Sequence, residues 1–232
     1  MNIKPLSLVI AAAGLALTLP WLASHASATD LDKQIPAAAS DPANPARSET
    51  AVLAGGCFWG QQGVFEHVKG VTKVVAGYSG GGWQTAQYDR VSDGDTGHAE
   101  SVQITFDPHQ VSFASLLRIF FSVAHDPTER NRQGPDEGTQ YRSEIFAASP
   151  GQEEVAKAYI AQLDGAHIFA RPIATKVEKL RAFYAAEDYH QDYLAKNPGA
   201  SYIKTNDLPK IAALKQVWPD FYQERPVLLA GR

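Results

Sequence analysis

The sequence has very little cysteine and no concentration of charge of one sign. It contains one cysteine, Cys57, among 232 residues, so the chain cannot close a disulfide within itself. No second His or Cys lies at ligand spacing from His98, so we expect no metal site. The formal net charge is only -4 and Lys and Arg form no block. This charge distribution excludes the electrostatic footprint of a protein that binds nucleic acid or anionic lipid.

The N-terminus has the composition of an export signal. Lys4 precedes an apolar run from Leu6 to Leu22, and the segment closes with Ala26-Ser27-Ala28. This pattern predicts a secretory signal peptide over residues 1–28, cleaved after Ala28, and therefore a periplasmic or secreted protein without stable membrane association. A retained membrane anchor is the alternative, although the apolar run is marginal in length for a membrane span.

The rest of the chain reads as a linker followed by one domain. Residues 29–49 are rich in Ala, Pro, Asp and Ser without periodicity and predict a flexible linker, and residues 50–232 form the folded unit. Hydrophobic periodicity predicts strands over 50–54, 71–78, 99–106, 141–148 and 173–180, and helices over 57–69, 112–124 and 151–163. Beyond Tyr189 we expect the chain to be richer in loops. This mixed order predicts an α/β or α+β two-layer domain, a sheet with helices packed on it.

The only thiol lies in a distinctive setting, Gly55-Gly56-Cys57-Phe58-Trp59-Gly60. The glycines permit a tight strand-to-helix turn and close approach of a substrate, and a helix N-terminus stabilises a thiolate, the reactive form of cysteine. Phe58 and Trp59 can wall an apolar pocket beside the sulfur. Each feature has an ordinary explanation, an inert buried cysteine or aromatics that fill the core, but their combination is more specific.

Two further segments offer groups for acid chemistry. Glu100 follows Gly97-His98-Ala99 at the start of a predicted strand, where burial would raise its pKa and make it a general acid. The alternative is a solvated strand charge, and His98 is interpreted as structural. The long loop from Asp126 to Gln140 is dense in hydrogen-bonding groups, so Asp136 and Tyr141 are site candidates, weighed against a solvated turn.

Six ordered motifs resemble the peptide methionine sulfoxide reductases of A type. They are GCFWG, GYSGG, GHAE, HDPT, RQGPDEGTQYRS and YHQDYLAKNP, and they extend over residues 50–198. The resemblance implies a ferredoxin-like two-layer α/β sandwich and a role for each matching residue. The implied roles are nucleophile for Cys57, methyl pocket for Phe58 and Trp59, proton donor for Glu100, orientation of the sulfoxide oxygen for Tyr88 and Tyr141, and a supporting carboxylate for Asp136.

The resemblance also implies the substrate, S-epimers of methionine sulfoxide, free or in proteins, in a repair reaction that leaves Cys57 as a sulfenic acid. Many relatives carry resolving cysteines near the C-terminus, whereas residues 199–232 contain none. We therefore expect no bound cofactor and an external reductant, a small thiol or a thioredoxin-like or glutaredoxin-like protein. The enzyme is expected to be a monomer. Gln62 replaces a frequent glutamate, and Thr85-Ala86-Gln87-Tyr88 replaces Asn-Pro-Thr-Tyr, so the Tyr88 assignment rests on the tyrosine alone.

Three other functions use some of the same residues. A single-cysteine thiol peroxidase would also pass through a sulfenic acid, but peroxide needs no methyl pocket. A papain-like protease fits less well, because the residues around Cys57 do not match its signature. A module that binds oxidised methionine without reducing it would need neither Cys57 nor Glu100.

Overall fold

Strand β1 (Glu49–Gly55) lies in the interior of the sheet, between β6 and β3, and its last five residues are all buried. The computed structural model describes residues 34–229, and the sheet within it has the order β7-β6-β1-β3-β2-β8. Its other strands are β2 (Val71–Ser79), β3 (Ala99–Phe106), β6 (Ser143–Ala147), β7 (Lys176–Lys179) and β8 (Phe183–Ala185). Strand β1 pairs antiparallel with β3 and β6, and β2 pairs antiparallel with β3 and β8. Strands β6 and β7 are parallel.

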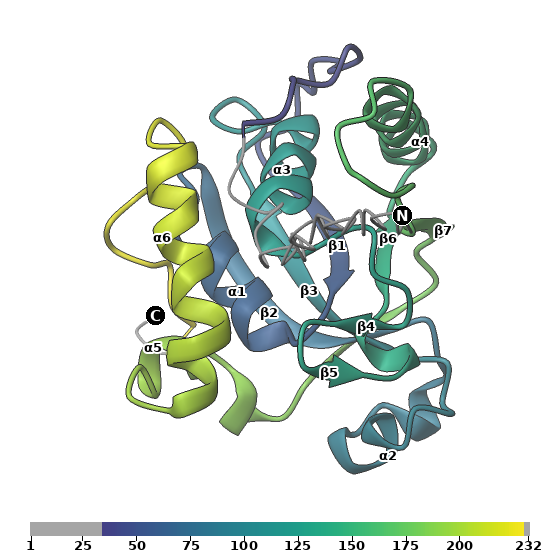
Figure 1. Ribbon diagram of the computed structural model, residues 1–232, viewed down its shortest axis with the longest axis vertical. Helices are drawn as coiled ribbons and strands as arrows, with labels where there is room; N and C mark the ends of the chain where they lie inside the picture. The colour runs from purple at the N-terminus through teal and green to yellow at the C-terminus, as the bar shows by residue number, and fades with distance from the viewer. Residues whose placement is uncertain (1–33, 230–232) are drawn as a thin grey trace, which may run out of the picture.

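Helices cover one face of this sheet (Figure 1). They are α1 (Phe58–Glu66), α3 (Phe113–Ile119) with a π-helical turn over Phe120–Ala124, α4 (Pro150–Gly165) and α6 (Leu208–Val217), which lies beside α1. Ser112 caps α3, accepting a hydrogen bond from the backbone N–H of Ser115 at 3.1 Å. The strands β1, β2, β3 and β6 with helices α1 and α3 give the order βαββαβ. The predicted ferredoxin-like two-layer sandwich is therefore confirmed.

The described part of the segment predicted to be a flexible linker packs against the domain. Ile35 is buried in the main core, and its carbonyl accepts a hydrogen bond from Arg118 Nε at 2.7 Å. The Tyr159 hydroxyl donates to the carbonyl of Pro36 at 2.6 Å. A single apolar side chain without periodicity gives no sequence signal for such docking. The predicted boundaries after residues 28 and 49 stay a prediction, and the predicted signal peptide lies outside the described residues.

Three expected elements differ from the structure. Strand β6 begins at Ser143, because Tyr141 closes a 3-10 turn (Thr139–Tyr141). The strand predicted over 173–180 is shorter and lies at the sheet edge as β7, largely exposed rather than in the core. The region after Tyr189, expected to be richer in loops, is in large part helical. It contains a 3-10 turn (Asp188–His190), α5 (Tyr193–Lys196), a π-helical turn (Ile203–Asp207) and α6.

Two long loops, residues 80–98 between β2 and β3 and residues 125–142 before β6, contain short elements. The first contains a 3-10 turn (Trp83–Thr85) and α2 (Tyr88–Ser92). The second contains a hairpin of β4 (Arg132–Gln133) and β5 (Asp136–Glu137). Figure 1 shows α2 and this hairpin at the same end of the molecule. Over residues 34–229, no helix has the length and apolar character required to cross a membrane.

Candidate active site

Cys57 lies in the tight turn between β1 and α1. Gly56 has a φ of +90°, and Cys57 is the N-cap residue of α1. A Cβ at Gly56 would lie 2.6 Å from the Cβ of Gln133, so both the backbone angle and the space require glycine. The predicted placement of the thiol at a helix N-terminus is confirmed, and the residue is only 9% exposed.

Glu100 is the second residue of β3 and lies beside the first turn of α1. Its Oε2 accepts a hydrogen bond of 3.0 Å from the backbone N–H of Phe58, the residue that follows Cys57. Burial raises the pKa of Glu100 to about 8, the negative charge of Asp136 adds to the rise, and the Phe58 N–H opposes it. The expected burial of this carboxyl is confirmed, and near neutral pH it carries a proton that it can donate.

Aromatic side chains from three segments form a wall beside the thiol. The Phe58 ring lies 4.9 Å from the ring of His190, and the Trp59 indole N–H donates to His190 Nδ1 at 3.0 Å. Trp59 also stacks on Tyr193, with 3.8 Å between the ring centroids, and packs edge-on against Tyr202, with 5.9 Å between the ring centroids. We call these five residues, Phe58, Trp59, His190, Tyr193 and Tyr202, the aromatic wall.

His190 joins the aromatic wall to a polar function. Because its Nδ1 accepts the Trp59 N–H, the proton of the neutral ring resides on Nε2, and burial lowers the pKa of His190 so that the ring stays neutral. That Nε2 is buried and has no hydrogen-bond partner within the described residues. It is therefore a donor available to a polar group that enters the site.

The two predicted tyrosines share an electrostatic environment with Cys57 and Glu100. The backbone N–H of Tyr88, at the start of α2, donates to Glu187 Oε1 at 2.9 Å, which anchors that helix. Burial raises the pKa of Tyr88 and of Tyr141, and negative charge on Glu100 and on Cys57 raises both further. Both phenols therefore stay protonated and can act as hydrogen-bond donors.

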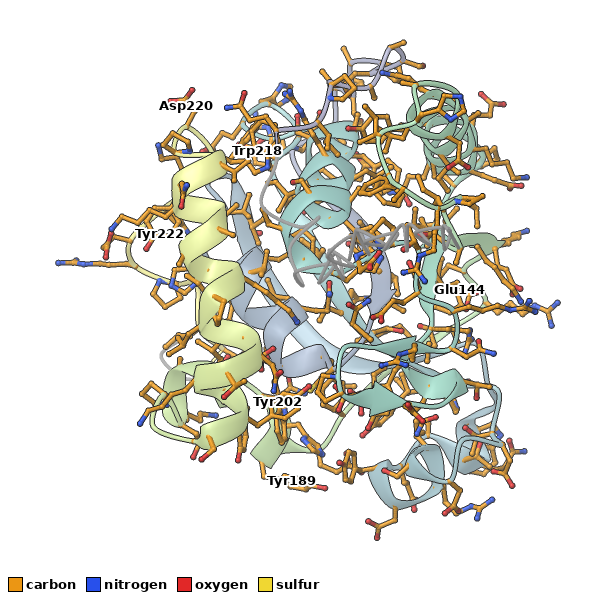
Figure 2. All side chains as sticks on the ribbon, in the orientation of Figure 1. Glu144, Tyr189, Tyr202, Trp218, Asp220 and Tyr222 are labelled. Carbon is orange, nitrogen blue, oxygen red and sulfur yellow. The ribbon has the colours of Figure 1, made fainter. Side chains whose placement is uncertain are left out.

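Asp136 lies on β5 and contacts the aromatic wall. Its Oδ2 accepts a hydrogen bond from the Tyr202 hydroxyl. Burial raises the pKa of Asp136, whereas the Tyr202 hydrogen bond and the charge of Lys210 lower it. Figure 2 shows Tyr202 and Tyr189 at the end of the molecule that carries the β4–β5 hairpin. The structure thus brings all seven predicted site residues into one region.

The resting protonation state of Cys57 differs from the expectation that the helix N-terminus alone would favour a thiolate. Burial raises the pKa of Cys57 well above its ordinary value, and the negative charges of Glu100 and Asp207 raise it further. The backbone N–H of Trp59 lowers it, but this contribution is smaller than the desolvation. Protonation of Glu100 near neutral pH removes one of the opposing charges.

The described residues contain no group of three or more His, Cys, Asp or Glu side chains arranged to hold a metal ion. A cavity of about 350 Å³ lies elsewhere, between residues 41–49 and the N-terminal ends of α3 and α4, and none of the site residues lines it.

The family model of peptide methionine sulfoxide reductase matches residues 49–222. The chain belongs to the peptide methionine sulfoxide reductase family. It is 58% identical over 182 residues to the peptide methionine sulfoxide reductase MsrA 2 of Mesorhizobium japonicum, which covers 78% of this chain and 93% of the relative. It is 48% identical over 175 residues to the MsrA of Deinococcus radiodurans, covering 75% and 84%.

Solved structures agree with this assignment. Mxr1 of Saccharomyces cerevisiae in its reduced form has a TM-score of 0.60 and 36% identity, covering 70% of this chain and 92% of that chain. Methionine sulfoxide reductase A of Corynebacterium diphtheriae has a TM-score of 0.57 and 36% identity, covering 68% of this chain and 78% of that chain. The reductase therefore reduces methionine sulfoxide to methionine, a reaction of protein repair.

Sequence reasoning missed three members of the aromatic wall, namely His190, Tyr193 and Tyr202. They lie more than a hundred residues after Trp59, and no periodic pattern relates them to it. One signal was present in the sequence: His190 and Tyr193 belong to the motif YHQDYLAKNP, which was used only to identify the family. Tyr202 lies beyond that motif, and only the fold connects it to Asp136.

Proposed function

We propose that Cys57 is the nucleophile and Glu100 the general acid of methionine sulfoxide reduction by this reductase. The observation that carries the proposal is the 3.0 Å hydrogen bond from the Phe58 N–H to Glu100 Oε2, which holds the acid next to the thiol-bearing turn. The Cys57 thiolate forms a bond to the sulfoxide sulfur while Glu100 protonates the sulfoxide oxygen. That oxygen passes to Cys57, methionine leaves with its sulfur reduced, and Cys57 becomes a sulfenic acid.

We assign the remaining site residues to substrate orientation. Phe58 and Trp59 offer an apolar surface for the methyl group, and the contacts of both with His190 support that role. Tyr88 and Tyr141 donate hydrogen bonds to the oxygen as it gains negative charge. Asp136 supports the site through Tyr202. With the oxygen and the methyl group fixed on different sides of the sulfur, the site selects one epimer, and the S-epimer is the one we propose.

We infer that the reductant is an external thiol. The sequence holds one cysteine, so the Cys57 sulfenic acid must condense with a thiol from another molecule, releasing water and leaving a mixed disulfide. A second external thiol then releases Cys57 and takes the disulfide. A small thiol, a thioredoxin-like protein or a glutaredoxin-like protein can supply both steps, and no bound cofactor is needed.

Trapping after a single turnover tests the nucleophile. The reduced protein receives one equivalent of a peptide containing methionine sulfoxide and then dimedone, which labels sulfenic acids. We expect one label, on Cys57, and one methionine per protein. A Cys57→Ser variant is the matched control and should give neither. Methionine produced by Cys57→Ser at the normal rate would refute the nucleophile.

We further propose that the reductase is an exported monomer. The support for export is the signal-like composition of residues 1–28. Expression of the full chain in a Gram-negative host should yield a periplasmic protein that begins at Thr29, identified by N-terminal sequencing. Light scattering should give the mass of one mature chain. A protein that retains residues 1–28 in the membrane fraction would contradict export, and a doubled mass would contradict the monomer.

A further inference from the structure

Asp207 occupies a helix-capping position without acting as a cap. It ends the π-helical turn over Ile203–Asp207 and is the N-cap residue of α6. An aspartate there ordinarily accepts a hydrogen bond from the first turn of its helix, which stabilises the helix. Within the described chain the Asp207 side chain makes no such bond to α6. Its carboxylate is used for another contact.

That contact is with the first turn of α1. A Cβ placed on Gly60 would overlap Asp207 Oδ1, so the carboxylate packs directly on the helix backbone three residues after Cys57. The Asp207 side chain is fully buried, and Lys210 Nζ lies 3.3 Å from Oδ1. Oδ2 has no hydrogen-bond partner among residues 34–229. An unpartnered buried acceptor destabilises the fold, so helix packing alone does not explain an aspartate here.

Asp207 belongs to the set of charged and titratable groups around the thiol. The set comprises Glu100 on β3, Asp136 on β5, Tyr88 on α2, Tyr141 at the 3-10 turn, Tyr202, Asp207, and Lys210 on α6. Asp207 raises the pKa of Cys57, and the Lys210 ammonium 3.3 Å from Oδ1 favours the charged form of the Asp207 carboxylate. Burial also raises the pKa of Asp207, and Lys210 lowers it.

We propose that Asp207 is a positioning residue that packs on the Cys57 turn and places a buried negative charge beside the sulfur, which makes the resting thiol less reactive toward oxidants. The proposal rests on the proposed role of Cys57 as nucleophile. Peroxide oxidises the thiolate rather than the thiol. A lone thiol that is held protonated until substrate arrives is therefore spared unproductive oxidation.

The size of the effect follows from general thiol chemistry. Removing a nearby like charge lowers a thiol pKa by about one unit or more, which multiplies the thiolate fraction about tenfold at pH 7. The less basic thiolate is about threefold less nucleophilic, because nucleophilicity falls with pKa at a Brønsted slope of about 0.4–0.5. The net expectation for Asp207→Asn is a reaction with a disulfide reagent about threefold faster at pH 7.

The experiment measures the rate at which Cys57 reacts with 2,2′-dipyridyl disulfide between pH 4 and pH 8. Asp207→Asn should react about threefold faster than the wild type at pH 7. The ratio should fall toward one at acidic pH, where the wild-type carboxylate also becomes neutral. Asp220→Asn, at an exposed position after α6 and at the far end of that helix from Tyr202 (Figure 2), is the matched control and should match the wild type throughout.

A charge effect and a loosened structure give different results. A loosened structure would raise the Asp207→Asn rate equally at pH 4 and pH 8 and would lower the urea midpoint of unfolding. That pattern would overturn the proposal, and so would an unchanged rate at pH 7. Asp207→Ser, smaller and also neutral, must reproduce the pH-dependent ratio if Asp207→Asn folds poorly. The assay reads the thiol and not turnover, so a Cys57→Ser enzyme that still reduced sulfoxide would refute the proposed function while leaving this result intact.

Discussion

Replacing Glu100 by glutamine tests the proposed acid with little change to the fold. Glutamine keeps a carbonyl oxygen that can accept the Phe58 N–H, which Glu100 Oε2 accepts at 3.0 Å. The substitution removes only the acidic proton. Because Glu100 is largely protonated at neutral pH, it also leaves the charge beside Cys57 almost unchanged.

The expected loss follows from the pKa of Glu100. With a pKa of about 8, about ten molecules are protonated for each ionised one at pH 7. General acid catalysis contributes about 10²–10⁴ in rate, equivalent to about 3–5 kcal/mol of transition-state stabilisation. We expect the single-turnover rate of Glu100→Gln to fall by that factor, with the dissociation constant for the sulfoxide nearly unchanged.

The pH profile supplies a second signature. Below pH 8 the wild-type rate at low substrate should rise with pH because thiolate forms at Cys57. Near pH 8 it should level off, because each further gain in thiolate is matched by a loss of protonated Glu100. Glu100→Gln has no acidic proton to lose at this position, so its rate should keep rising through pH 8.

The assay is a rapid-quench measurement of methionine formed from a sulfoxide peptide by excess reduced enzyme. Glu137→Gln is the matched control, because Glu137 lies on β5 near the site with a side chain that is 77% exposed. The control should behave as wild type. A Glu100→Gln rate within about twofold of the wild type, or a profile that still levels near pH 8, would refute the assignment of Glu100.

Three other substitutions test the aromatic wall, the docking of the N-terminal segment and a buried carboxyl. His190→Ala removes the acceptor of the Trp59 indole N–H, a loss of about 1–3 kcal/mol, and should raise the KM for sulfoxide about tenfold. An unchanged KM would mean that His190 does not contribute to sulfoxide binding. Ile35→Ala should cost about 2–5 kcal/mol in urea unfolding, and an unchanged midpoint would mean that the N-terminal segment is not docked. Glu66 has a pKa raised to about 9 by burial and by Asp192, so its stabilising protonated form is complete at low pH and is lost as pH rises through 9. Glu66→Gln should therefore lessen the fall in urea midpoint between pH 6 and pH 9.5, and an equal fall in both proteins would contradict the buried carboxyl.

Much of the fold could be predicted because its strands and helices bury apolar side chains at regular spacing along the sequence. Strand β3 alternates cleanly, and Ser112 marks the start of α3 with a capping side chain. The failures occurred where tertiary contacts override local pattern. Tyr141 looks like part of a strand but closes a turn, and the strand predicted over 173–180 is only the short edge strand β7, whose lysines and glutamate are exposed.

The site likewise contains residues that the sequence predicts and residues that only the tertiary packing reveals. Cys57, Glu100 and their neighbours lie in short motifs, so the sequence alone predicts them as site residues, with glycines marking the tight turn. The residues that hold them come from the C-terminal third, where α6 buries Ala213, Leu214 and Val217 without a strong periodic signal. Asp207 could not be identified from the sequence, because only the packing of α6 on α1 brings it to Gly60.

The geometry also constrains the order of the catalytic cycle. Cys57 is only 9% exposed, and both Glu100 and the aromatic wall contact Phe58, the residue that follows it, so we expect that methionine and an incoming thiol cannot reach the sulfur together. The sequence contains no cysteine besides Cys57, so the second thiol comes from another molecule. Methionine must leave before the reductant enters, which predicts ping-pong kinetics. Initial rates with varied sulfoxide at several dithiothreitol concentrations should give parallel double-reciprocal lines, and lines that intersect would mean that both reactants bind at once.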